Sequence, residues 1–273
     1  MTSGAPDAWD GIAAAAGALA ASSHAIALTG AGLSVESGIP SFRGPDGLWT
    51  RYGQPSNLSY REFVADPQGW WEQRLHDEVT AGNPTYDLKD AADNADPNPG
   101  HLALVQLEQA GVLKATITQN VDDLHGRAGS RALLEIHGNR NFMRCVGCGQ
   151  RWPRSGYVIT DVPPVCDACG GVVKLDTVMF GEPIPSATLE ACFAEVQRCD
   201  AMLLVGTSGT VNPAAQFPLL ARDLGAKIIE VNPGPTQLTD AADIAINGPA
   251  GVVLPGIVEL VQQRLGRKGE DEG

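Results

Sequence analysis

The feature that most constrains the fold of this chain is a regular alternation of short apolar runs with helical patterns. Six runs are rich in Ile, Val, Leu and Ala, which is typical of parallel strands buried on both faces. The runs are residues 25–29, 115–118, 133–136, 201–205, 227–231 and 243–246. The helical patterns are residues 7–22, 100–110, 187–198, 213–224 and 255–265. Strands that alternate with helices predict an α/β fold, a Rossmann-like, doubly wound parallel sheet with helices on both faces.

Two segments interrupt this alternation and indicate further parts. Residues 39–99 are rich in Gly, Pro, Trp and Tyr and are too long for an ordinary connection, so we interpret them as a flexible functional loop followed by a helical insertion. Residues 139–177 contain the closely spaced cysteines and indicate a small separate module. The remaining segments would form one discontinuous domain with a disordered, charged tail at its end. The domain would comprise residues 1–38, 100–138 and 178–266, and the tail residues 267–273.

The cysteines predict a structural metal site. Four of the six form two C-x-x-C pairs, which are Cys145, Cys148, Cys166 and Cys169. Each pair can lie on a tight turn that brings two thiolates to about 2.3 Å from one zinc ion, and four thiolates leave no open coordination position. Two disulfides are the alternative, disfavoured because the sequence has no recognisable secretion signal. Cys192 and Cys199 lack partners at ligand spacing, so we expect both to be buried apolar residues.

Charge and hydropathy limit the class of partner. The chain has 19 basic and 32 acidic residues, a net charge of -13 and a pI near 4.7. Nucleic-acid binding is disfavoured because it uses clustered Lys and Arg to neutralise phosphates. A membrane is disfavoured by the same charge and because no apolar stretch reaches the roughly 18 residues needed to span one. We therefore expect a cytoplasmic protein with a cationic or Lys-rich partner.

The first apolar run leads into a glycine turn. Residues 25–32 read AIALTGAG, and glycines at such a turn let backbone N–H groups approach a diphosphate. The motif is G-A-G-x-S rather than G-x-G-x-x-G, and no clear acidic residue ends a strand about 20 positions later. Taken alone, this turn could equally be structural.

Further blocks, in order along the chain, make the motif specific. They are GAGLSVESGIPSFRGPDGLW from residue 30, TQNVDDLH from 118, EIHGN from 135, the two C-x-x-C pairs, VMFGEPIP from 178, VGTSGTVNPAA from 205, EVN from 230 and GPAGVVLP from 248. Together they resemble the sirtuins, the NAD-dependent protein-lysine deacylases of bacterial and archaeal type. The resemblance implies NAD as co-substrate, one structural zinc ion and removal of acyl, chiefly acetyl, groups from lysine, giving nicotinamide and 2′-O-acyl-ADP-ribose.

The resemblance also implies catalytic residues. In sirtuins the acyl carbonyl oxygen attacks C1′ of the ribose as nicotinamide leaves, and the ribose 2′-hydroxyl then attacks the alkylimidate with the help of a base. His137 matches that base, because imidazole titrates near neutral pH. Asn120 is the second catalytic candidate and would hold ribose hydroxyls and an ordered water together with Gln119. His125 is the competing histidine, and we assign it a structural role.

The implied cofactor site draws on several blocks. Asp122 would accept a hydrogen bond from the nicotinamide carboxamide, and Phe42 would shield C1′ from water. Arg43 would lie in the flexible loop near the diphosphate, and Asn232 with Ala250 would frame the adenosine. The complete set is Gly30, Ala31, Gly32, Ser34, Ile39, Phe42, Arg43, Gln119, Asn120, Asp122, Gly206, Thr207, Ser208, Asn232 and Ala250.

The implied substrate site is an extended loop. Val178, Phe180, Gly181 and Glu182 resemble the segment that receives the acyl-lysine peptide as an added strand, with Val178 and Phe180 walling the acyl-lysine tunnel. Trp70 to Arg74 fall where members that prefer succinyl- or malonyl-lysine carry a Tyr-x-x-Arg pair. Trp71 and Arg74 would share a helix face, so Arg74 could bind a distal carboxylate, the alternative being a solvated helix face. Because the Tyr is missing, we expect mainly deacetylation, with detectable desuccinylation that depends on Arg74.

Three other functions compete with this interpretation. Mono-ADP-ribosyl transfer shares the cofactor and the broken bond, but it has less need of a base such as His137. A zinc-ribbon module that senses NAD without turnover would release no nicotinamide. A dehydrogenase is disfavoured because the sequence lacks the dinucleotide fingerprint.

Overall fold

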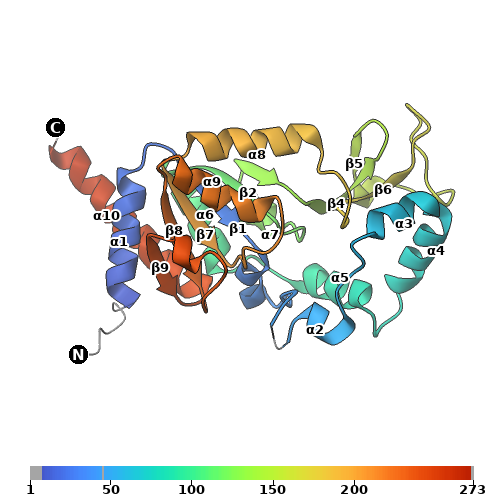
Figure 1. Ribbon diagram of the computed structural model, residues 1–273, viewed down its shortest axis with the longest axis horizontal. Helices are drawn as coiled ribbons and strands as arrows, with labels where there is room; N and C mark the ends of the chain where they lie inside the picture. Colours follow the sequence, from blue (N-terminus) through green and yellow to red (C-terminus); the bar gives the residue numbers. More distant parts are fainter. Residues whose placement is uncertain (1–7, 45, 272–273) are drawn as a thin grey trace.

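The computed structural model describes residues 8–44 and 46–271 (Figure 1). Residues 1–7, residue 45 and residues 272–273 lie outside the described residues. They fall in the start of the predicted domain, in the predicted loop and in the predicted tail.

Six parallel strands form the main sheet in the order β3-β2-β1-β7-β8-β9. The strands are β1 (Ala25–Thr29), β2 (Leu113–Thr118), β3 (Leu133–Glu135), β7 (Ala201–Val205), β8 (Lys227–Asn232) and β9 (Ile244–Asn247). Each predicted apolar run is a strand, and the order is that of a doubly wound dinucleotide-binding fold. The predicted fold class is therefore confirmed. The strand order reverses between β1 and β7, which makes their carboxyl ends the topological switch point.

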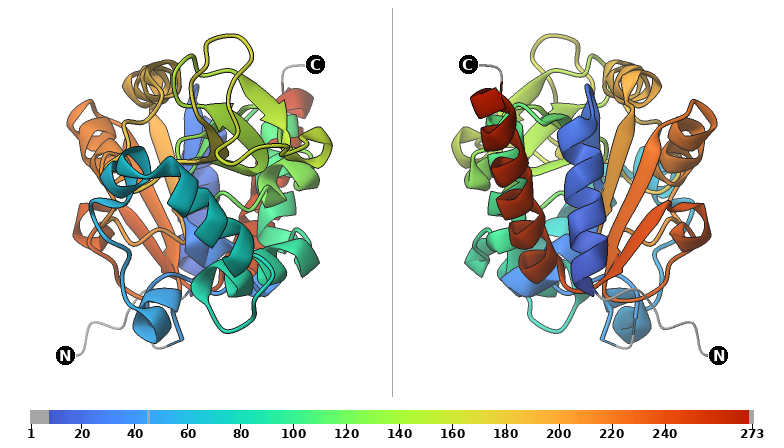
Figure 2. Two further views of the ribbon diagram at one scale, coloured as in Figure 1. Left: turned by 90° about the vertical axis from the view of Figure 1, so that its right-hand side faces the viewer. Right: turned by 90° about the vertical axis from the view of Figure 1, so that its left-hand side faces the viewer.

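Both faces of the inner strands are buried, as the apolar runs predict. Ala25, Ala27 and Leu203 belong to one core, and the alternating residues Ile26 and Leu28 to the other. The first core is covered by α1 (Ala8–Ala21), α6 (Pro99–Gln109) and α10 (Ala250–Asp271), and the second by α8 (Ser186–Arg198) and α9 (Phe217–Asp223). Figure 2 shows α1 and α10 side by side across the first face. Cys192 and Cys199 are buried in the second core, as predicted.

The last helix is longer than the pattern at 255–265 predicts. It begins at Ala250, where the Gly251 N–H donates to the Glu36 carboxylate at 2.7 Å, an acceptor far away in the sequence. It continues to Asp271, so the expectation of a disordered tail is wrong for residues 267–271. No proline follows Pro255 in the sequence to end the helix. Among the helices of the described residues, none is long and apolar enough to cross a membrane.

The insertion before α6 is helical, as predicted, and its helices begin with a repeated local signal. It contains α2 (Leu48–Tyr52), α3 (Ser59–Ala65), α4 (Pro67–Asp77) and α5 (Pro84–Asn94). Helices α4, α5 and α6 each start with a proline preceded by Asp66, Asn83 or Asn98, whose side chain accepts a backbone N–H of the first turn. A capping side chain followed by proline favours a helix start at that position. Short 3-10 turns occupy Ala31–Leu33, Val35–Ser37, Arg154–Gly156, Ala214–Gln216 and Thr239–Ala241.

The cysteine-containing segment forms a second, antiparallel sheet in the order β5-β4-β6. Its strands are β4 (Gly138–Cys145), β5 (Arg151–Pro153) and β6 (Val173–Thr177). Trp71 of α4 is 2% exposed in its small core, and its indole N–H donates to the Val173 carbonyl at 3.0 Å. This module and α3–α4 lie together at the end of the molecule away from α1 and α10 (Figure 1).

Candidate active site

The loops after β1 and β7 approach each other closely at the switch point. The Gly32 N–H donates to the Gly206 carbonyl at 2.8 Å, and a Cβ atom on Gly32 would lie 2.7 Å from the Gly206 Cα. Gly206 has a φ of +60°, and a Cβ there would lie 2.2 Å from the Leu33 nitrogen. Glycine is therefore required on both loops. The predicted glycine turn lies where doubly wound sheets bind ligands.

A buried polar cluster lies beside these glycines. Asn120, after β2, donates from its Nδ2 to the Gly30 carbonyl at 3.0 Å and to the Ser34 hydroxyl at 3.1 Å. The Ser34 hydroxyl donates to Asp122 at 2.7 Å, and Asp122 also accepts the Leu124 N–H at 2.9 Å. Burial raises the pKa of Asp122, and these two hydrogen bonds oppose that shift. The structure thus brings together three predicted side chains from two distant blocks, Ser34 from one and Asn120 and Asp122 from the other.

His137 follows β3 at the edge of this cluster. Its Nδ1 lies 3.1 Å from the Gln119 carbonyl oxygen. Because a carbonyl can only accept, Nδ1 carries the proton of the neutral ring and Nε2 keeps a free lone pair. Burial lowers the pKa of His137 from its usual value, the hydrogen bond to Gln119 opposing this, so the ring is neutral at pH 7. A neutral imidazole held in this tautomer can accept a proton at Nε2.

His125 lies behind the cluster, in the short helix α7 (Leu124–Ala128). The Thr29 hydroxyl donates to Thr118, so the His125 Nε2–H donates to the Thr29 oxygen at 2.9 Å. The ring meets His101 edge to face at 5.1 Å, and burial lowers the pKa of His125 to about 4. A ring enclosed in this way agrees with the structural role expected for it.

The loop after β7 is joined to its neighbours through Thr207. Its hydroxyl accepts the Gln119 side-chain amide at 2.9 Å, and its carbonyl accepts the Asn232 amide at 2.9 Å. The Ser208 hydroxyl lies 2.8 Å from that of Thr210. Ala250 is the first residue of α10 and its side chain packs in the core, so only its backbone can face a ligand.

An aromatic series joins the predicted cofactor loop to the predicted substrate loop. The ring of Trp49 lies 5.5 Å from Phe42 and 5.8 Å from Phe180, and the Arg43 guanidinium lies 4.1 Å from its centroid. Arg43 also approaches the Ser208 hydroxyl at 3.5 Å. The sequence interpretation did not single out Trp49. Its only local signal is a large aromatic residue in an otherwise polar, glycine-rich loop.

The predicted substrate loop is held at several points. The Val178 N–H donates to the His137 carbonyl at 2.9 Å, and the Phe180 carbonyl accepts the Tyr60 N–H at 3.1 Å. Gly181 has a φ of +80°, the left-handed region that favours glycine. Glu182 differs from the expectation of a peptide-facing residue, because its side chain is 2% exposed and pairs with Arg144 and Lys174.

In the structure, Arg74 makes its side-chain contact with a carboxylate of its own helix segment. Its Nε donates to Glu78 at 2.7 Å, and Glu78 also accepts from Arg154 of the small module at 2.5 Å. Trp71, which is expected on the same helix face, packs in the module core, where its indole N–H donates to the Val173 carbonyl. Between the described residues, no hydrogen bond or ion pair joins Arg74 to His137 or to residues 178–182.

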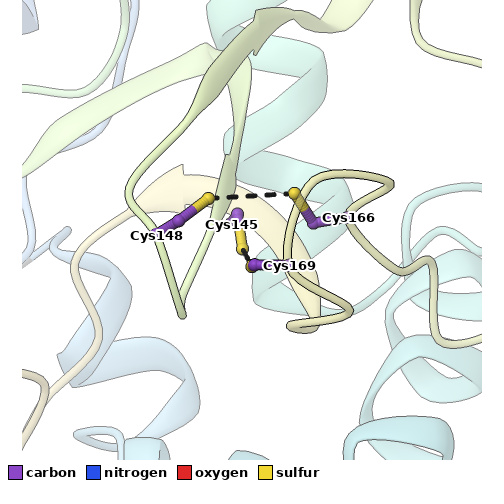
Figure 3. A group of neighbouring side chains, drawn as sticks. All are labelled: Cys145, Cys148, Cys166 and Cys169. Carbon is purple, nitrogen blue, oxygen red and sulfur yellow. Dashed lines mark hydrogen bonds between the residues drawn. The ribbon is translucent and has the colours of Figure 1, made fainter.

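The four paired cysteines converge at the tip of the small module (Figure 3). The Sγ atoms of Cys145 and Cys169 lie 3.5 Å apart, and those of Cys148 and Cys166 lie 3.8 Å apart. Tetrahedral zinc with bonds of about 2.3 Å would place its sulfurs roughly 3.8 Å apart, whereas a disulfide needs about 2.05 Å. All four are free thiols. Their donor set and spacing fit one structural zinc ion.

Comparisons with known proteins agree with this arrangement. The model of the Sir2 family matches residues 30–213. An NAD-dependent protein deacylase 2 of Pyrobaculum aerophilum is 45% identical over 253 residues, covering 90% of this chain and 94% of that protein.

Two solved structures extend the likeness to the fold. A Sir2 homolog in complex with NAD is 42% identical, with a TM-score of 0.75 and coverage of 92% of this chain and 93% of that chain. Sir2Af2 bound to a myristoylated histone peptide is 36% identical, with a TM-score of 0.66 and coverage of 94% and 99%. The chain belongs to the Sir2 family.

Proposed function

We propose that this protein removes acyl groups, chiefly acetyl, from protein lysines with consumption of NAD. The observation that carries the proposal is the neutral His137 ring, held by Gln119 beside the buried Asn120–Ser34–Asp122 cluster at the switch point. Such a site offers a general base next to a dinucleotide-binding edge. The printed name of a relative that is 45% identical, an NAD-dependent protein deacylase, supports the same activity.

We assign NAD to the loops after β1, β2, β7 and β8. When bound, NAD supplies a ribose carbon that becomes electrophilic as nicotinamide leaves. Asp122 and Ile39 would hold the nicotinamide, and Asn120 and Gln119 would hold ribose hydroxyls. Gly30, Ala31, Gly32, Ser34, Gly206, Thr207, Ser208, Asn232 and the backbone of Ala250 would line the rest of the dinucleotide. Phe42 and Arg43, packed on Trp49, would exclude water from the reacting carbon.

His137 would act as the base of the second stage. Its Nε2 lone pair would accept a proton from the ribose diol, and the Gln119 carbonyl would stabilise the resulting imidazolium through Nδ1–H. Because its pKa lies below the usual value, the free base is the main form at neutral pH.

The peptide would bind along residues 178–182, with Val178 and Phe180 near the acyl-lysine side chain. A relative's structure with a myristoylated histone peptide supports a peptide substrate of this kind. The four cysteines would hold zinc as a structural ion, because four thiolates leave no site for substrate.

The division of the chain into a discontinuous domain, an insertion and a module also remains our proposal. The cytoplasmic localisation of the protein remains a prediction.

The test is a product analysis. The protein is incubated with NAD and one lysine peptide in acetyl, succinyl, malonyl and unmodified forms, and the products are identified by mass spectrometry. We expect deacetylated peptide, nicotinamide and 2′-O-acetyl-ADP-ribose in equal amounts. ADP-ribose attached to a peptide would favour mono-ADP-ribosyl transfer, and NAD binding without release of nicotinamide would favour a sensor.

A further inference from the structure

A buried ion cluster joins the small module to the predicted substrate loop. It consists of Arg144, Lys174, Asp176 and Glu182. Arg144 on β4 lies directly opposite Lys174 on β6, a pairing of like charges that destabilises a sheet unless carboxylates intervene. Two carboxylates do so, because Arg144 donates from Nε to Asp176 at 2.6 Å and from Nη2 to Glu182 at 2.5 Å, and the Lys174 Nζ lies 3.0 Å from Glu182. Arg151 at the edge of the cluster also pairs with Asp176 at 2.6 Å and lies 3.3 Å from Glu135, so every cation here has a carboxylate partner.

The same side chains hold the backbone on both sides of the loop. Glu182 accepts the Met179 N–H at 2.9 Å, which closes the loop on its own carboxylate. The Lys174 ammonium donates to the Thr177 carbonyl at 2.7 Å and to the Leu175 carbonyl at 3.0 Å, just before the loop. The loop also begins with the Val178 N–H bound to the His137 carbonyl. Residues 177–182 are thus tied to the cluster at one side and to the catalytic candidate at the other.

The cluster is inaccessible to a peptide. The side chains of Lys174 and Glu182 are 0% and 2% exposed, and those of Asp176 and Arg144 are 5% and 9% exposed. A buried charge is tolerated only with its partners, so removing one member leaves another uncompensated and the loop displaced. Any effect of these residues on substrate must therefore act through the backbone of the loop.

We propose that Glu182, Arg144 and Lys174 are positioning residues that hold residues 178–182 in the conformation to which the peptide adds as a strand. The inference rests on the proposed function and assigns peptide affinity to the interior of the small module. Cys145 follows Arg144 on β4 and is paired with Val173, so the register set at the metal site also fixes the Arg144–Lys174 pair. The metal site would thereby support peptide binding without contacting the peptide.

The test compares two carboxylate-to-amide changes, one in the substrate loop and one in the small module. Glu182→Gln keeps an acceptor for Met179 but removes the buried charge, and Asp161→Asn removes a charge from an exposed side chain. We expect Glu182→Gln to raise the KM for acetyl-lysine peptide at least tenfold, with kcat within threefold and the KM for NAD within twofold of wild type. Amide hydrogen exchange should rise in residues 177–182 and stay unchanged in β1, β2 and β7. Asp161→Asn should match wild type in every measurement.

A peptide KM within twofold of wild type for Glu182→Gln, or an equal rise for Asp161→Asn, would overturn the inference. If Glu182→Gln does not fold, Arg144→Lys takes its place in the test. A lysine ammonium cannot reach both Asp176 and Glu182, as the planar guanidinium of Arg144 does. Peptide affinity is also measured without NAD, by fluorescence anisotropy of a labelled acetyl-lysine peptide. Wild-type binding without turnover would contradict the proposed function alone, whereas turnover with unchanged affinity in the variants would contradict only this inference.

Discussion

The main sheet and the small module are stabilised in different ways. The four inner strands β2, β1, β7 and β8 each contribute side chains to both large apolar cores, so burial of apolar surface dominates there. The module has a small core, and two of its buried members are metal-ligand candidates. That core comprises Trp71, Met143, Cys145, Cys166, Val173 and Leu175. A core of this size needs a metal and ion pairs, whereas the sheet needs only close packing.

The largest expected effect comes from removing one cysteine ligand. Cys145→Ser should lose the zinc ion, unfold the module and lower deacylation by more than about 100-fold, because zinc binding supplies folding free energy to a small domain. Elemental analysis gives the metal content, and hydrogen exchange shows which part unfolds. Cys199→Ser is the control. This thiol is buried in the second core of the main sheet, just after α8, so the variant should keep one zinc ion per chain. An active Cys145→Ser protein with a full zinc complement would contradict the contrast between the two regions.

The next effect tests the packing of the sheet at the switch point. Gly206→Ala forces a Cβ atom to 2.2 Å from the Leu33 nitrogen at a positive φ. We expect a loss of about 2–5 kcal/mol in the free energy of unfolding, from roughly 1–2 kcal/mol for the left-handed backbone and roughly 1–3 kcal/mol for displaced neighbours. NAD affinity, measured by calorimetry, should fall with it. Gly156→Ala in the module is the control because its Cβ has open space, and a comparable loss there would refute the argument.

Acid should weaken the sheet through its buried histidines. Burial lowers the pKa of His125 to about 4 and that of His101 to about 3, against about 6.5 in the unfolded chain. The contribution of the neutral rings to the free energy of unfolding is therefore fully present above about pH 6.5. It is lost as the pH falls toward 4, because the unfolded chain binds protons that the folded protein does not. We expect His125 to account for a loss of about 2 kcal/mol between pH 7.5 and 5.0.

Urea unfolding of wild type and His125→Gln at both pH values measures this effect. Glutamine keeps an N–H donor for Thr29 and does not titrate, so its loss on acidification should be smaller by about that amount. Equal losses in the two proteins would exclude His125 as the source.

The smallest effect concerns the contact between the insertion and the module. Arg74→Met removes an ion pair with Glu78 that is partly exposed, so the free energy of unfolding should fall by at most about 1 kcal/mol. Because Arg74 is engaged with Glu78, the ratio of kcat/KM for succinyl- and acetyl-lysine peptides should stay within twofold of wild type. A selective loss of desuccinylation would restore Arg74 as an acyl-reading residue.

Features that depend on local sequence patterns could be predicted from the sequence. The six strands and the four cysteines follow from composition and spacing within a few residues, and Asn120 with His137 from the blocks that contain them. What it missed are contacts between residues far apart in the sequence. Trp49 meets Phe180, Glu36 meets α10, and Glu182 meets β4, contacts that no periodicity records. The contacts of Trp71 and Arg74 show the same limit, because helical spacing gives a shared face but not what that face contacts.

The central claim is that His137 is a base that acts after NAD has bound. The most direct measurement is kcat for an acetyl-lysine peptide together with the Kd of NAD, for wild type and His137→Ala. Removing a general base should lower kcat by about 10²–10⁴-fold, and the Kd of NAD should stay within threefold, because the Asn120–Ser34–Asp122 cluster is untouched. A His137→Ala protein that deacetylates within tenfold of wild type would contradict the account.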